Sequence, residues 1–377
     1  MRSLIDLLGS PDGHTFLEER GVQVSEDAFV GGLRTPVRSG LGDVVDLGPG
    51  SLVYTAHQLQ CDYALSVTAK LRTLADFNGR DDIAPLAAWL DMDRTGSNKL
   101  STSIAWPRGG GSVRLAPQRF KEREPRFVPV ERDRLQEVMA KLEAWARSVG
   151  DDGAIQRHRP LAEALLADGV DTLADANLRL TSAMLKGYLG VEVPSVLVSD
   201  VAARGLLTEP VEAAVAHLDG FVGVFNAAID ALVAADVDPQ VRHLGEGYFP
   251  LRYSCSNCQA RCTLVHRRRD ADHFAEVTCR SCGAEHRFHL GSGTPSAGEV
   301  FATGRWSADV SLPAYLNDLV SGVVVGRSSA LYGLVLNEVV AKVLGGDPVP
   351  ALIPPRLSEI LETDSAGSLL YEYLTSG

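Results

Sequence analysis

Four cysteines stand in two C-x-x-C pairs, Cys255-Ser-Asn-Cys258 and Cys279-Arg-Ser-Cys282, with 20 residues between the pairs. Each pair can close a tight turn in which two thiolates point at one ion, and two such turns supply the four sulfurs of a tetrahedral zinc site. A redox function is the alternative, but redox C-x-x-C motifs occur singly at the start of a helix. We therefore expect these four residues to bind a structural zinc, in a closed site that leaves no position open for chemistry.

The residues between the two pairs have the pattern of short antiparallel strands. Thr263–Arg269 and His273–Thr278 are expected to be strands, with a turn at Asp270–Asp272 between them. This arrangement predicts a zinc ribbon. Of the two remaining cysteines, Cys61 and Cys262, the second could be a spare ligand or a free buried thiol. So few cysteines suit a reducing cytoplasm, which is the predicted location.

A second group of polar residues ends the apolar run Ser51–Ala56, in the sequence Tyr54-Thr-Ala-His57-Gln58. In parallel sheets, ligands bind beyond the carboxyl ends of the strands, where N–H groups of the next helix face an anion. We predict His57 and Gln58 as catalytic residues that contact a phosphate, with Tyr54 as a binding residue. A polar strand end without function is the alternative. Lys70 is expected three to four turns into the following helix, too far away for the same phosphate.

Two carboxylates follow a second apolar run, Ala84–Leu90. Asp91 and Asp93 are at positions i and i+2, which share one face of a strand, and could hold an ammonium group, a ribose or a divalent ion. Solvated loop charges are the alternative. We predict both aspartates as catalytic residues, and Asn98 and Lys99 as binding residues.

A third group combines Gly304-Arg-Trp-Ser-Ala-Asp309 with the strand–turn–helix pattern of Val323–Ser329. Arg327 offers a planar fork for a carboxylate or a phosphate. An ordinary strand–helix turn is the alternative. The predicted binding residues of this group are Asp309, Gly326, Arg327, Ser328 and Ser329.

The elements that must position these residues alternate between strands and helices. Strand, helix and strand between residues 51 and 90, and again between 322 and 353, indicate a parallel sheet. We predict an α/β fold with a Rossmann-like core in residues 1–130 and 293–377. A helical segment at 131–245, including one long helix from Thr208 to Leu232, and the zinc ribbon at 246–292 interrupt this core. Residues 1–50 predict only weak strands.

Composition limits the function classes. With 377 residues, 45% of them hydrophobic, the chain can bury a large core, and its net charge of −12 argues against broad nonspecific nucleic-acid binding. The charged start, Met1-Arg-Ser-Leu-Ile-Asp6, does not predict a signal peptide. Charged and polar residues break the apolar stretch Val320–Leu344, so no membrane span is expected.

The order of these motifs resembles the catalytic half of class I aminoacyl-tRNA synthetases, particularly the lysyl type. Tyr248-Phe-Pro250 and the two cysteine pairs resemble the entry to that family's zinc ribbon, and Val324–Ser329 and Gly345–Pro348 resemble the turn and helix exit that shape its amino-acid pocket. The resemblance implies a class I synthetase (HUP-type) core that binds ATP with Mg²⁺. Lys99-Leu-Ser-Thr-Ser103 imitates the Lys-Met-Ser-Lys-Ser signature, but precedes the ribbon.

The chain is also similar to the bacillithiol-synthase-type cysteine ligase, which shares the synthetase-like core. Thr55–Gln58 with Lys70, Trp306–Val310 and Pro354–Arg356 carry this similarity. Together the two resemblances imply a carbon–nitrogen ligase that joins an amino acid, such as cysteine, to a small-molecule acceptor with ATP. The alternative is a catalytically silent synthetase paralogue that binds RNA, nucleotide or protein.

Overall fold

The structure, a computed structural model, describes residues 1–24, 45, 50–106, 111–150, 152–190, 192–309, 320–346, 349–363 and 367–375. Five strands of these residues form one all-parallel sheet, so the α/β prediction is confirmed and the sheet is compatible with a Rossmann-like core. The strands, in spatial order, are β13 (Ala351–Ile353), β12 (Gly322–Val324), β1 (Ser51–Gln58), β2 (Ile83–Leu90) and β5 (Ser195–Leu197).

The strand order reverses between β1 and β12. From β1 the chain proceeds outward to β2 and then β5, whereas from β12 it proceeds outward in the opposite direction to β13. In chain order along the sheet this is the 3-2-1-4-5 arrangement of doubly wound folds. Such sheets bind ligands beyond the carboxyl ends of the two strands that flank the reversal. We call the carboxyl ends of β1 and β12, with the residues beside them, the switch point.

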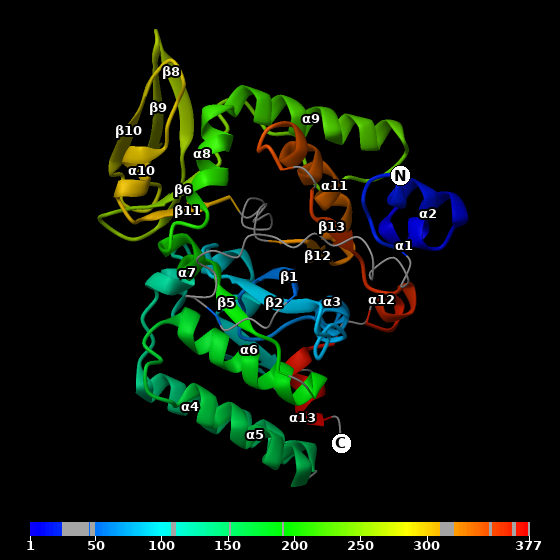
Figure 1. Cartoon of the computed structure of the whole chain (residues 1–377). Helices are drawn as coiled ribbons and strands as arrows, with labels where there is room; N and C mark the ends of the chain where they lie inside the picture. Colours follow the sequence, from blue (N-terminus) through cyan, green and yellow to red (C-terminus); the bar gives the residue numbers. More distant parts are fainter. Residues whose placement is uncertain are drawn as a thin grey trace.

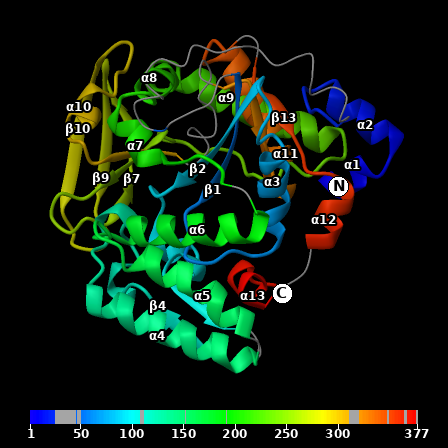
Figure 2. The ribbon, with the colours of Figure 1, turned by 60° about the horizontal axis from the view of Figure 1, so that its bottom comes forward.

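Helices cover both faces of the sheet. Figures 1 and 2 agree in placing α9 and α11 on one side and α4, α5 and α6 on the other. Each side has its own hydrophobic core, with Leu52 and Tyr54 of β1 in one core and Val53 in the other. The helices are α1 (Leu4–Leu8), α2 (Pro11–Glu18), α3 (Ser66–Ala75), α4 (Arg132–Val149), α5 (Asp152–Leu165), α6 (Leu173–Leu189), α7 (Val198–Ala203), α8 (Thr208–Ala216), α9 (Leu218–Ala234), α10 (Gly298–Ala302), α11 (Arg327–Lys342), α12 (Leu357–Thr363) and α13 (Leu369–Thr375).

Local sequence explains several element boundaries. The first five residues of β1 are all buried, as expected for a strand covered by helices on both faces. Thr172 caps α6 through a reciprocal pair of hydrogen bonds with Asp175. Gly150 and Gly190 end α4 and α6 in the left-handed conformation that glycine adopts without strain.

Three expectations about the elements are wrong. The segment 131–245 is not wholly helical, because β5 lies within it and pairs with β2. The helix predicted from Thr208 to Leu232 is two helices, α8 and α9, which bend by 90° at His217. Residues 1–24 contain the helices α1 and α2 where only weak strands were expected; residues 25–44 and 46–49 lie outside the described residues.

Residues 251–308 form a largely antiparallel unit, which we call the cysteine module. Its strands are β6 (Leu251–Ser254), β7 (Arg261–Thr263), β8 (Val265–Arg269), β9 (Asp272–Thr278), β10 (Glu285–Ser292) and β11 (Trp306–Ala308). Sheet β10-β9-β8 extends away from the core, and sheet β11-β6-β7 lies against it (Figure 1). The predicted boundary at residue 292 is therefore too early, since β11 returns to pair with β6.

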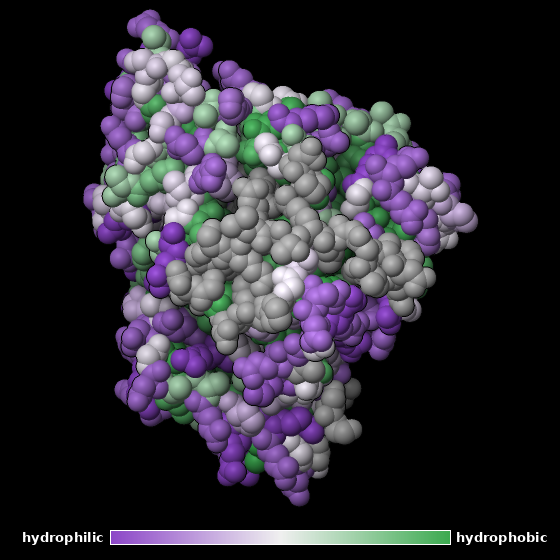
Figure 3. Space-filling view, in the orientation of Figure 1, coloured by the Kyte–Doolittle hydropathy of each residue, from purple (hydrophilic) through white to green (hydrophobic). Residues whose placement is uncertain are grey.

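Between β2 and α4 the chain forms a short hairpin, β3 (Ser103–Trp106) with β4 (Gly111–Arg114), preceded by 3-10 turns. On the described surface in Figure 3, hydrophilic residues predominate over the lower helices and over α2. Within the described residues, no single helix is long and apolar enough to cross a membrane; only the bent pair α8 and α9 passes that test together.

Candidate functional site

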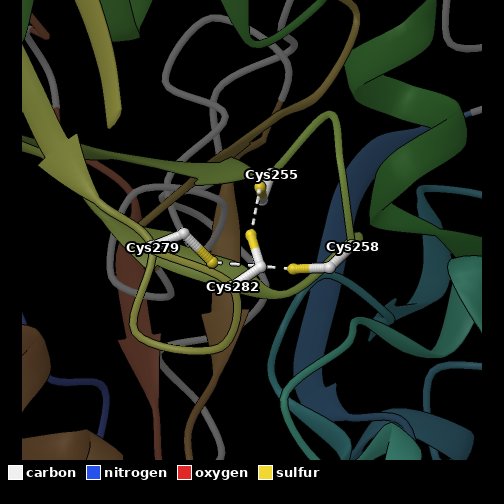
Figure 4. A group of neighbouring side chains, drawn as sticks. All are labelled: Cys255, Cys258, Cys279 and Cys282. Carbon is white, nitrogen blue, oxygen red and sulfur yellow. Dashed lines mark hydrogen bonds between the residues drawn. The ribbon is translucent and has the colours of Figure 1, made fainter. Parts of the chain in front are cut away.

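The side chains of Cys255, Cys258, Cys279 and Cys282 converge from two turns of the cysteine module (Figure 4). Their Sγ atoms all lie within 4.8 Å of one another, and two Sγ–Sγ separations, Cys255–Cys282 and Cys258–Cys279, are 3.6 Å. Sulfurs bound tetrahedrally at about 2.3 Å from zinc are about 3.8 Å apart. The four cysteines are therefore close enough to bind one metal ion.

The two turns have the same backbone pattern. In the first, Cys255 N–H donates to Ala260 O (2.9 Å) and Gln259 N–H donates to Cys255 O (2.8 Å). The second repeats these bonds 24 residues later, between Cys279 and Ala284 and between Gly283 and Cys279, both at 2.8 Å. The residue after each second cysteine has a positive φ, 63° at Gln259 and 74° at Gly283. Two equivalent turns thus present the thiols toward a common centre.

Without a metal, the four thiols cannot all be ionised together. Burial opposes ionisation at Cys279, but backbone hydrogen bonds lower the pKa of its thiol to about 7, whereas burial raises the pKa of Cys258 to about 12. A divalent cation would stabilise all four groups as thiolates. His286 Nε2 lies 3.2 Å from Cys255 Sγ and can donate to that thiolate. Cys262 is buried outside the group of four, and its thiol donates to Ala260 O.

A second polar cluster lies at the switch point. His57, near the carboxyl end of β1, is partly buried, and the centre of its ring lies 5.7 Å from that of the Tyr63 ring. Thr55 Oγ1 donates to Val324 O (2.8 Å), which joins the ends of β1 and β12 directly. Gly326 follows β12 and is the N-cap residue of α11. His57 and the Gly326 turn are thus at neighbouring strand ends, although 269 positions separate them in the sequence.

Lys70 completes this cluster, contrary to the expectation that it is too distant. Its Nζ donates to Ala56 O (2.7 Å) and lies 3.1 Å from His57 Nδ1. A Cβ atom on Gly326 would be 3.6 Å from Lys70 Cδ, so the lysine stem lies against the start of α11. Burial lowers the pKa of Lys70 to about 7, and burial together with the nearby Lys70 charge lowers the pKa of His57 well below its usual value.

The first turn of α11 faces solvent beside this lysine. Arg327, Ser328 and Ser329 are exposed, and the Ser329 hydroxyl accepts a hydrogen bond of 2.7 Å from Gly326 N–H. The first N–H groups of a helix have no intrahelical partners and carry partial positive charge. A buried ammonium group and a helix N-terminus therefore adjoin at the switch point, and both favour an anion.

Gln58 connects the switch point to the loop after β2. Its Nε2 donates to Asp93 Oδ2 (3.2 Å) and to Ser97 Oγ (2.5 Å). Asp93 Oδ1 in turn lies 3.3 Å from Nη1 of Arg261, on strand β7 of the cysteine module. This chain of contacts links β1, β2 and the cysteine module at the carboxyl edge of the sheet.

Asp91 and Tyr54 do not have the positions expected of them. Strand β2 ends at Leu90, and Asp91 does not share a strand face with Asp93: it is fully buried and accepts hydrogen bonds from Ser199 N–H (3.0 Å) and Oγ (2.5 Å). It therefore holds the start of α7, and burial raises its pKa to about 6. Tyr54 is fully buried in the hydrophobic core, so its ring is inaccessible to a ligand.

The other predicted binding residues are dispersed. Asn98 accepts a hydrogen bond from Leu100 N–H (2.9 Å) and caps a 3-10 turn, and Lys99 is exposed on that turn. Asp309 pairs with Arg252 (2.9 Å), which is on strand β6 of the cysteine module, and accepts from Tyr248 Oη (3.3 Å). The structure therefore groups His57, Gln58 and Asp93 with the α11 turn and leaves Asn98 and Lys99 apart.

A buried ion network was missed by the sequence analysis. Glu124, fully buried, accepts from Arg126 Nε (2.7 Å) and from Ser307 Oγ (2.7 Å), and lies 3.4 Å from Arg261 Nε. These residues come from three distant parts of the chain and fasten the cysteine module to the core. Their only signal in the sequence is the alternating charge of Glu122-Arg-Glu-Pro-Arg126.

Comparison with known proteins does not assign the chain to a family. No model of a known protein family matches the sequence, and no curated protein matches it significantly. The chemistry available to this chain must therefore be argued from its own residues.

Proposed function

We propose that this protein is an ATP-using ligase that activates the carboxylate of an amino acid, such as cysteine, and joins it to a small-molecule acceptor. The observation that carries the proposal is Lys70. Its amine is buried at the switch point of a doubly wound sheet, and no carboxylate forms an ion pair with it within the described residues. Burying an uncompensated ammonium group is unfavourable, and a bound phosphate would supply the missing negative charge.

In the proposed reaction, the phosphates of ATP, bound with Mg²⁺, lie between Lys70, His57 and the first turn of α11. The substrate carboxylate attacks the α-phosphorus of ATP and displaces pyrophosphate, which gives an acyl adenylate. The amine of the acceptor then attacks the acyl carbon, and the amide forms with release of AMP and a proton. His57 would stabilise the charge that develops on the phosphate oxygens. Arg327 would bind a carboxylate or phosphate through its planar fork.

The two resemblances to synthetase-like enzymes support the amino-acid part of the proposal, as does the position of the cysteine module. This module is inserted between the third and fourth strands of the sheet in chain order, before the last part of the nucleotide-binding fold. We further propose that its cysteines bind a structural zinc in a ribbon, because four thiols converge and leave no position for a substrate.

Amino-acid-dependent exchange of labelled pyrophosphate into ATP tests the function, together with amide formation across a panel of acceptor amines. His57→Ala should lower turnover on the order of a hundredfold or more while leaving folding intact. Arg327→Ala should chiefly raise the KM of a substrate. Nucleotide binding without turnover for any amino acid would refute the ligase and favour the silent paralogue. Absence of nucleotide binding would refute the ligase and would also refute a paralogue that binds nucleotide.

A further inference from the structure

A large polar cavity lies between the cysteine module and the loop that follows β2. Its volume is about 650 Å³, and side chains from both sides line it. Asp93 and Arg94 come from the loop, Arg252 and Arg261 come from strands β6 and β7, and Arg280 comes from the second cysteine turn. We call this space the interface cavity.

The lining of the interface cavity is basic in a chain that is acidic overall. It includes four arginines and two carboxylates, Asp93 and Glu122, whereas the whole chain has a net charge of −12. Glu124 and Asp309, which do not line the cavity, pair with Arg261 and Arg252, so Arg280 is the lining arginine without a counter-charge among the described residues. The charge of Arg280 and the N–H donors of the other guanidinium groups favour a ligand with negative charge.

The two carboxylates of the lining already have partners. Asp93 accepts from Gln58 and pairs with Arg261, and Glu122 pairs with Arg94 at 3.3 Å. An amino or ammonium ligand would have to displace these contacts. The carboxylates therefore fix the guanidinium groups and leave the cavity poorly suited to a cation.

The arginines, in contrast, keep donors available. The Arg261 side chain is only 9% exposed and is held by Asp93 and Glu124, so its guanidinium is fixed at the cavity wall. Arg280 is exposed and has no hydrogen-bond or ion-pair partner within the described part of the chain. Each guanidinium has five N–H donors in a planar fork that matches carboxylate and phosphate oxygens.

We propose that the interface cavity binds a small polyanion, a ligand that carries two or more phosphate or carboxylate groups. Arg280 and Arg94 bind these groups from opposite sides, and the fixed Arg261 binds at the wall. If the proposed function holds, this polyanion is the acceptor substrate, with its anionic groups in the cavity and its amine outside the cavity, toward the switch point. Asp93 lines the cavity and accepts a hydrogen bond from Gln58, which is next to His57 in the sequence. A ligand in the cavity would therefore lie beside the switch point.

Calorimetric titration without ATP tests the cavity separately from turnover. The probes are inorganic triphosphate for the phosphate source and citrate for the carboxylate source, at fixed ionic strength. The double variant Arg94→Gln with Arg280→Gln should weaken binding of at least one probe tenfold or more. The matched control, Arg267→Gln with Arg268→Gln, removes the same charge from exposed positions on β8 outside the cavity and should leave binding unchanged. Metal content is measured in every variant, because Arg280 lies between two of the clustered cysteines.

A third variant separates this proposal from the nucleotide site. Triphosphate bound at the switch point would depend on Lys70, so loss of binding in Lys70→Met alone would overturn the cavity site and support the proposed function. Loss in the Arg94 and Arg280 variant but not in Lys70→Met supports the cavity site, even if no ligase activity is found. Equal losses in the cavity and control variants, or no saturable binding of either probe, would also overturn the proposal.

Discussion

Replacing Lys70 by methionine should stabilise the protein near neutral pH and at the same time abolish nucleotide binding. Burial lowers the pKa of this lysine to about 7 from an ordinary value of 10.5. The unfolded chain therefore binds more protons than the folded protein between these two pH values, and stability rises with pH through this window.

The magnitude follows from the two pKa values. At about 1.4 kcal/mol per pH unit, the buried amine costs about 4 kcal/mol of folding free energy at pH 7, and less than about 1 kcal/mol at pH 10. Methionine removes this cost but also removes the hydrogen bonds to Ala56 O and His57 Nδ1, worth about 1 kcal/mol each. Lys70→Met should thus be roughly 2 kcal/mol more stable than the natural chain at pH 7, with the gain lost by pH 10.

Urea unfolding at pH 7 and pH 10 measures the stability, and calorimetric titration with ATP measures the binding. Lys121→Met is the matched control, because Lys121 is exposed, and it should change neither quantity appreciably. If the Lys70→Met protein is less stable than the natural chain at both pH values, burial of the Lys70 amine does not destabilise the fold as argued. Unchanged ATP affinity would refute the role of Lys70 at the switch point.

The remaining predictions concern the cysteine module and its attachment. Cys279→Ser should lose bound zinc and destabilise the module, whereas Cys262→Ser should keep the metal. Elemental analysis and thiol titration measure the two outcomes, and a natural protein without metal and with four reactive thiols would contradict the site. Gln259→Gly should raise stability by about 0.5 kcal/mol in urea unfolding, because φ is 63° at this position and glycine adopts such a φ without strain. Gly283→Ala, where φ is 74° and a Cβ would meet open space, should lower stability by about 1 kcal/mol, and changes of the opposite sign would contradict the equivalence of the two turns. Glu124→Gln should cost roughly 3 kcal/mol in the same assay, since Arg126 loses the carboxylate that it pairs with and Arg261 keeps only Asp93. A neutral effect would show that the network is dispensable.

Local sequence patterns were sufficient for the elements that they encode directly. The spacing of the four cysteines predicted their convergence, because each C-x-x-C turn is closed by hydrogen bonds within six residues. The apolar runs predicted β1 and β2 nearly to their bounds, since strands buried on both faces need apolar residues in succession. The same apolar run predicted that the polar residues His57 and Gln58 lie at the carboxyl end of β1.

Other elements depended on contacts that local sequence does not specify. Strand β5 has only three residues, so its pairing with β2, not its own pattern, makes it part of the sheet. Asp91 looks like Asp93 in the sequence, but only the position of α7 decides that one carboxylate is buried and the other lines a cavity. The bend between α8 and α9 similarly follows from packing, because apolar residues continue through both helices.

The clearest difference between the sequence-based expectation and the structure is the position of Lys70. Counting residues along a helix from Gln58 puts its amine about 18 Å from the strand end, at 1.5 Å per residue. In the structure α3 begins only at Ser66, so the chain turns back before the helix starts, and Lys70 lies beside His57 and Gly326. The sequence by itself determined which residues could bind an anion or a metal. Only the tertiary structure decided which of them meet, because strand order and the path of a connection depend on packing between segments that are hundreds of residues apart.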